Sequence, residues 1–99
     1  MAVAIIGDVA GGTAELDQEI MRQLGVSPSS PPPGAMMRLS GPIAGGWRVF
    51  TVWDAQESWD AFRRDRLEPL FRTMGREMPS VEVWPLHAMM VQPGAVSAP

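Results

Sequence analysis

Residues 45–62 read GGWRVFTVWDAQESWDAF, which is the pattern of a buried strand that leads directly into an amphipathic helix. The odd-numbered residues from Trp47 to Trp53 are uncharged and share one face of that strand, while Phe50 and Val52 make the other face apolar as well. A strand that is apolar on both faces needs a cover on both. In a chain of 99 residues we expect one cover to be its own helices and the other a second copy of the protein.

The remaining elements follow from hydrophobic periodicity and from turn residues. The helix between Thr13 and Gly25 has an N-cap residue at its start and a glycine stop at its end, and Pro85 suits an edge strand. The expected strands cover residues 2–6 (or 2–9), 35–40, 47–53 and 81–86; the expected helices cover 13–25 and 55–74, and the expected turn covers 41–46. This β-α-β-β-α-β order predicts an α+β, ferredoxin-like fold with a four-stranded antiparallel sheet.

Composition limits the partners. We expect one domain over residues 1–91 and a flexible tail over 92–99. The net charge of −3 and the pI of about 4.9 argue against nucleic acid. No apolar run is long enough to cross a membrane, and the N-terminus lacks the basic segment of a signal peptide. Without cysteine there is no disulfide framework, so we expect a cytoplasmic protein.

The absent residue types limit the chemistry. The chain has no Cys, Lys, Tyr or Asn and one His, so a thiolate, a Schiff-base lysine and a multi-histidine metal site are excluded. General acid–base work is left to His87 or to one of 11 carboxylates. No phosphate-binding loop is evident, because the glycine pairs at 11–12 and 45–46 are isolated. We therefore predict no cofactor: no intrinsic metal, flavin or heme.

A group of short motifs carries a resemblance. The motifs are an N-terminal strand, Thr13-Ala14-Glu15, Pro32-Pro33-Gly34, Ser40-Gly41-Pro42, Gly46-Trp47-Arg48-Val49, Val52-Trp53, and Val81-Glu82-Val83 with His87. Together they resemble small actinobacterial proteins of the dimeric α+β barrel superfamily, relatives of the antibiotic-biosynthesis monooxygenases. The resemblance covers roughly residues 1–90. It implies two protomers that pack their sheets face to face, each with a small-molecule pocket between sheet and helices.

The resemblance does not transfer a complete catalytic set. Quinone-forming and heme-degrading members of the superfamily use sets that include Asn, or Asn and Tyr, and this chain has neither. The most similar members have a His on the second strand where this chain has Arg38. The sequence leaves open which face of the sheet Arg38 occupies.

Two polar side chains are candidates for chemistry, each with a structural alternative. His87 follows the end of the last strand and is either a proton-transfer group or an exposed residue. Arg66 lies between Phe62 and Leu70 on the predicted apolar stripe of the second helix. It is either a ligand anchor or half of an ion pair with Asp54, Asp8 or a carboxylate of the partner subunit.

The aromatic residues give the candidate binding wall. Trp47, Trp53, Trp59 and Phe62 form either ordinary core or a flat cavity for an aromatic ligand. The first hypothesis is a cofactor-independent oxygenase, cyclase or isomerase acting on a hydrophobic aromatic or polyketide-like molecule. In it His87 moves a proton and Arg66 or Arg38 stabilises an enolate or phenolate. The alternative is a non-catalytic, dimeric ligand-binding or accessory protein.

Overall fold

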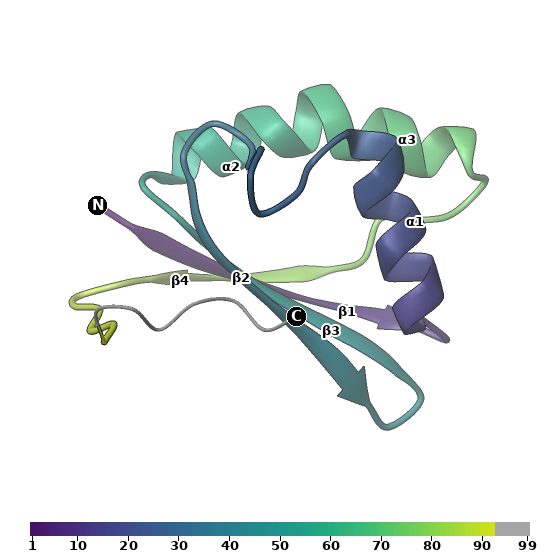
Figure 1. Ribbon diagram of the computed structural model, residues 1–99, viewed down its shortest axis with the longest axis horizontal. Coiled ribbons are helices and arrows are strands. Elements are labelled where there is room, and N and C mark those ends of the chain that lie inside the picture. The colour runs from purple at the N-terminus through teal and green to yellow at the C-terminus, as the bar shows by residue number, and fades with distance from the viewer. Residues whose placement is uncertain (93–99) are drawn as a thin grey trace.

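Residues 1–92 of the computed structural model form an antiparallel sheet with helices on one of its faces (Figure 1). The spatial order of the strands is β2-β3-β1-β4, so β4 lies at an edge as Pro85 predicted. The elements confirm the predicted α+β ferredoxin-like arrangement: β1 (Val3–Ala10), α1 (Ala14–Leu24), β2 (Ala35–Ile43), β3 (Gly46–Trp53), α2 (Gln56–Phe62), a π-helical turn η1 (Arg63–Leu67), α3 (Glu68–Thr73) and β4 (Val81–Pro85). The flexible tail predicted over 92–99 lies, from residue 93 on, outside the described residues.

Helix α1 begins and ends where its capping residues predict. The Thr13 side chain accepts a hydrogen bond from the Leu16 backbone N–H at 3.1 Å, and Gly25 follows the last turn with a left-handed φ of 69°. Its buried residues, Ile20 and Leu24, lie one turn apart on the face toward the sheet. None of the helices within residues 1–92 has the length and hydropathy of a membrane-spanning segment.

The hairpin between β2 and β3 is tighter than predicted. The turn predicted over residues 41–46 is wrong, because β2 continues to Ile43 and leaves Ala44 and Gly45 as the connection. Gly45 has a φ of 77°, in the left-handed region that a residue with a Cβ rarely adopts. Because a short turn fixes the register of a hairpin, Arg38 pairs with Thr51 and both side chains face the helices.

The second helical segment is not the single α-helix predicted over 55–74. Within it, the Glu68 N–H donates to the carbonyl of Arg63, five residues back, which defines the π-helical turn η1. Such a turn holds one more residue than an α-helical turn, so the phase of the helix shifts. Pro69 contributes to this shift, because it has no N–H to donate to the carbonyl of the residue four positions before it. The apolar stripe therefore runs from Phe62 to Leu67 and Phe71 instead of through Arg66.

The core lies between the sheet and the helices. One group of buried side chains comprises Val3, Ile5, Trp53 and Trp59, and a second comprises Ile20, Leu24 and Phe71. Phe62 and Leu67 pack against both groups. The sheet and the long helical segment are thus joined by aromatic packing, with the Trp53 ring centroid 5.8 Å from that of Trp59.

The sheet face without helices, which we call the outer face, is also largely apolar. Leu39, Phe50 and Ile6 are neighbours across β2, β3 and β1, and Trp84 lies on the same face of β4. Leu39 is 56% exposed and Trp84 is 52% exposed. Val52, which we expected a partner subunit to cover, is already buried within the single chain. The outer face retains large exposed apolar side chains at both of its edges.

Candidate functional site

A cavity of about 110 Å³ lies between the sheet and the helices. Side chains of β1, β2, β3, α1 and the long helical segment line it together with residues 78–81. Most of its wall is apolar: Trp53, Trp59, Phe62 and Phe71 supply rings, and Ile5, Val9, Ile20, Met21, Val49, Leu67, Met78 and Val81 supply aliphatic or thioether groups. The odd-numbered side chains of β3 from Val49 to Trp53 face this cavity, as the strand pattern predicted.

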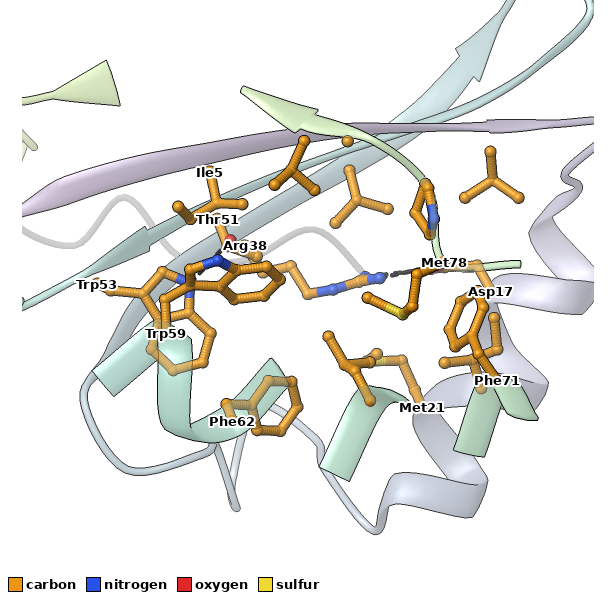
Figure 2. Close-up of a pocket in the computed structure, with 17 residues that line it drawn as sticks. Ile5, Asp17, Met21, Arg38, Thr51, Trp53, Trp59, Phe62, Phe71 and Met78 are labelled. Atoms are coloured by element: carbon orange, nitrogen blue, oxygen red, sulfur yellow. Dashed lines mark hydrogen bonds and ion pairs between the residues drawn. The ribbon is translucent and has the colours of Figure 1, made fainter. Parts of the chain in front are cut away.

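Two charged side chains line the cavity, Asp17 of α1 and Arg38 of β2, and they are paired. The Arg38 Nη2 and Nη1 atoms donate to Asp17 Oδ1 and Oδ2 at 2.5 and 3.1 Å. Ser40 lies beside them, with its Oγ 3.4 Å from Asp17 Oδ2 and 3.4 Å from Arg38 Nη1. Figure 2 shows the Arg38 side chain extending along the cavity toward Asp17. The side chains are 31% and 13% exposed, so the pair lies at the partly solvated end of an apolar space.

The aromatic wall is held in place by packing and by one hydrogen bond. The Trp53 ring, 1% exposed, lies 5.3 Å from the Phe62 ring and donates its Nε1–H to Thr51 Oγ1 at 2.9 Å (Figure 2). Trp59 is also buried. Of the four aromatic residues predicted to form a binding wall, Trp53, Trp59 and Phe62 therefore lie together at the cavity.

Trp47 lies elsewhere, against α1. It lines a hollow of about 10 Å³ with Thr13, Leu16 and other residues, and not the main cavity. Its Nε1–H is buried and has no hydrogen-bond partner among the described residues. A hollow of this size is close to the minimum for one water molecule, which is the simplest partner for that donor. The prediction that Trp47 shares a wall with Trp53 is wrong, because the twisted sheet carries the start of β3 past the main cavity.

Arg66 does not reach the cavity. Its side chain is exposed, and its Nη2 donates to the carbonyl oxygen of Leu24, the last residue of α1. Its Cζ lies 5.8 Å from the centre of the Phe62 ring. The predicted position on the inward stripe is wrong because Arg66 lies within the turn η1, where the helical phase shifts. Within residues 1–92 the guanidinium forms an ion pair with neither Asp54 nor Asp8, and instead binds the C-terminal end of a helix. The ion pair with a carboxylate of the partner subunit stays a prediction.

His87 is exposed and lies beyond the end of β4. The strand contributes Val81, at its opposite end, to the cavity, and the next segment is tied down where the Leu86 N–H donates to the Ala2 carbonyl at 2.9 Å. His87 and Arg38 are therefore not brought together. Within a single chain, His87 therefore does not reach the cavity and cannot act there as a general base.

Asp17 is the functional candidate that the sequence reasoning missed. By its place in the sequence, Asp17 is one of two acidic residues in the first turn of a helix, where a negative charge favours the helix dipole. However, Asp17 precedes Ile20 and Leu24 by three and seven residues, which puts it on their face of α1. A carboxylate that continues an apolar stripe was the signal that this side chain faces the sheet.

Replacing Arg66 with alanine is expected to leave ligand binding at the cavity unchanged. The variant should lose about 1 kcal/mol of unfolding free energy, because it removes one charge-assisted hydrogen bond at the surface. Urea unfolding measures the stability, and a titration of tryptophan fluorescence with an aromatic ligand measures binding. If a folded Arg66→Ala protein no longer bound the ligand, Arg66 would be part of the ligand site after all.

Among residues 1–92, no three His, Cys, Asp or Glu side chains gather closely enough to hold a metal ion. The absence of an intrinsic cofactor stays a prediction. No protein-family model matches the sequence, and no curated protein does.

Solved structures with the same fold are numerous. A heme-degrading protein from Mycobacterium tuberculosis is 14% identical, with 92% of this chain and 100% of that one covered and a TM-score of 0.61. A candidate antibiotic biosynthesis monooxygenase from Chloroflexus aurantiacus is 16% identical, with 93% and 100% covered and a TM-score of 0.60. A variant of SnoaB, a cofactor-independent oxygenase from Streptomyces nogalater, is 10% identical, with 93% and 96% covered and a TM-score of 0.55. The resemblance to antibiotic-biosynthesis monooxygenases is thus confirmed for the fold.

Proposed function

We propose that this protein is a cofactor-independent enzyme of the oxygenase type that acts on a hydrophobic aromatic molecule in the cavity. The observation that carries the proposal is an aromatic cavity with one guanidinium, that of Arg38, at its polar end. Trp53, Trp59 and Phe62 would hold the ring of the substrate, and Arg38 would stabilise an ionised oxygen on it. SnoaB and the heme-degrading protein, which share this fold, support an oxygenase.

The electrons in such a reaction come from the substrate. An electron-rich phenolic ring reduces dioxygen, and one oxygen atom enters a ring carbon to form the second carbonyl group of a quinone. The other oxygen atom leaves as water with the hydrogen of that carbon and the hydrogen of the hydroxyl group. The contribution of the protein is electrostatic, because ionising the substrate oxygen makes the ring a stronger reductant. The substrate would bind with its hydroxyl group uncharged, and Arg38 is the cavity residue that would stabilise the negative charge as it develops on that oxygen.

The active unit is proposed to be a homodimer formed through the outer face. Leu39 and Trp84 are exposed there at opposite edges, and Phe50 and Ile6 lie between those edges. An interface that covered this face would reach the size of a stable dimer, roughly 2,000 Å² in total. The cytoplasmic location remains a prediction from the sequence.

The alternative is a non-catalytic, dimeric ligand-binding or accessory protein. The position of His87 favours it, since the one histidine of the chain is not among the residues that line the cavity. Both functions use the same cavity, and they differ in whether the bound ring is changed.

Isotopically labelled dioxygen distinguishes the two. The substrates are a panel of phenols that contain one ring, two fused rings or three fused rings. We expect the protein to accelerate the incorporation of one labelled oxygen atom into a member of this panel. Arg38→Met should slow that reaction about a hundredfold, the effect of removing one strong stabiliser of a developing oxyanion. Arg66→Lys, which changes a guanidinium outside the cavity, is the matched control. If the panel binds at the cavity but is not oxidised faster than in buffer, the binding-protein function is correct.

A further inference from the structure

We infer that Asp17 sets the charge specificity of the cavity. By neutralising Arg38 it makes the cavity select an uncharged single ring that carries a hydroxyl group, and reject an organic anion of the same size. The inference rests on the proposed function in one respect, namely that the cavity is a ligand site. It adds a substrate class and a specificity-determining residue.

The first step is the balance of charge. Arg38 and Asp17 are the only charged side chains that line the cavity within residues 1–92, and two hydrogen bonds join them. The polar end of the cavity therefore has no net charge. An incoming carboxylate would bring a second negative charge to share one guanidinium at the partly solvated end of an apolar space, which is unfavourable. An unpaired arginine would have the opposite preference.

The second step is the hydrogen-bonding capacity that the pair leaves open. A carboxylate is purely an acceptor and a guanidinium is purely a donor. Asp17 Oδ1 accepts from Arg38 alone, so a lone pair remains, and Arg38 has donors that neither Asp17 nor Ser40 takes. A hydroxyl group can donate to Asp17 and accept from Arg38 at the same time. A carboxylate offers no donor, and an ammonium group offers no acceptor.

The third step is size. A cavity of about 150 Å³ with an apolar wall binds benzene. The cavity here, about 110 Å³, matches one ring and not several fused rings. The rings of Trp53, Trp59 and Phe62 line the apolar part of that space (Figure 2). A ligand with its ring among them and its hydroxyl group at the Asp17–Arg38 pair uses both halves of the cavity.

The test in the unaltered protein compares phenol with benzoate at neutral pH. Calorimetry gives the affinities, and the indole N–H signals of the four tryptophans in NMR spectra give the location. We expect phenol to bind at least about tenfold more tightly than benzoate. The signals of Trp53 and Trp59 should shift, whereas the signal of Trp84, on the outer face, should not.

Substitution of Asp17 should reverse this preference. In Asp17→Asn the guanidinium of Arg38 loses its counter-charge, so benzoate should gain about tenfold or more in affinity and phenol should lose. Asp65→Asn is the matched control, because it breaks the exposed Arg64–Asp65 ion pair on the helical layer, away from both the cavity and the outer face. That control should keep the preference of the unaltered protein.

The outcomes separate the two proposals. If neither phenol nor benzoate shifts the Trp53 and Trp59 signals, the cavity is no ligand site and both proposals fail. If benzoate binds at the cavity as tightly as phenol, the specificity role of Asp17 fails and the proposed function stands. Should Asp17→Asn not fold, the comparison in the unaltered protein still decides. A folded Asp17→Asn protein that keeps the preference for phenol would also overturn the role of Asp17.

Discussion

Leu39→Asp protein is expected to be a monomer at concentrations where the unaltered protein would form the proposed dimer. Leu39 is 56% exposed on the outer face, beside Phe50, so a charge at this position costs little in a single chain. In a dimer that pairs two outer faces, the same change buries two carboxylates without partners, which opposes association strongly. Light scattering coupled to size-exclusion chromatography measures the mass directly.

A charge placed on the other layer of the molecule is the control for this experiment. Gln18→Asp adds the same charge to an exposed position of α1, the helix that covers the opposite face of the sheet (Figure 1). It should leave the dimer intact. A stable monomer of the unaltered protein at micromolar concentration, or a dimer of Leu39→Asp protein, would show that the outer face is not the interface.

Trp53→Ala is expected to cost about 4 kcal/mol of unfolding free energy, the range for loss of a large aromatic side chain from a core. Trp53 is 1% exposed, its ring packs against Trp59 and Phe62, and its indole N–H is bonded to Thr51. A domain of this length has roughly 5–15 kcal/mol in total. The variant should therefore retain only marginal stability, which urea unfolding measures at a fixed protein concentration.

An exposed tryptophan provides the comparison. Trp84 lies on β4 and is 52% exposed. Its replacement by alanine in the monomeric Leu39→Asp background should lower the unfolding free energy by less than about 1 kcal/mol. That background removes any contribution from the dimer interface. If Trp53→Ala and Trp84→Ala lost equal amounts of unfolding free energy, the packing of Trp53 in the cavity wall would not be a main source of stability.

The periodic parts of the fold were predictable from the sequence. The alternation of β3 and the caps of α1 depend on neighbouring residues, and the structure confirms both. Two irregularities were not predictable from a regular period. The turn η1 moves Arg66 off the inward stripe, and the two-residue hairpin places Arg38 opposite Thr51. The first changes the phase of a helix and the second sets the register of a hairpin, and a pattern count that assumes regular geometry detects neither.

The candidate site was predicted in part for the same reason. Its aromatic half is large and periodic, so Trp53, Trp59 and Phe62 could be assigned to one wall. Its polar half depends on a pair between α1 and β2, Asp17 with Arg38, which are 21 residues apart in sequence. Pairing at that separation depends on the hairpin register and on the way α1 lies across the sheet. A local sequence pattern predicts neither of these.

Arg38 and Leu39 are consecutive residues of β2 that point to opposite faces of the sheet, one to the cavity and one to the outer face. In evolutionary terms this adjacency links two traits. A single-residue insertion between Leu39 and the hairpin turn, unless a bulge absorbed it, would exchange the two faces, placing leucine at the cavity and arginine on the outer face. Ligand preference and self-association would then change in the same generation, whereas point substitutions can tune each separately. A change of length between Leu39 and the hairpin turn is thus a single mutation that acts on both faces of the sheet at once.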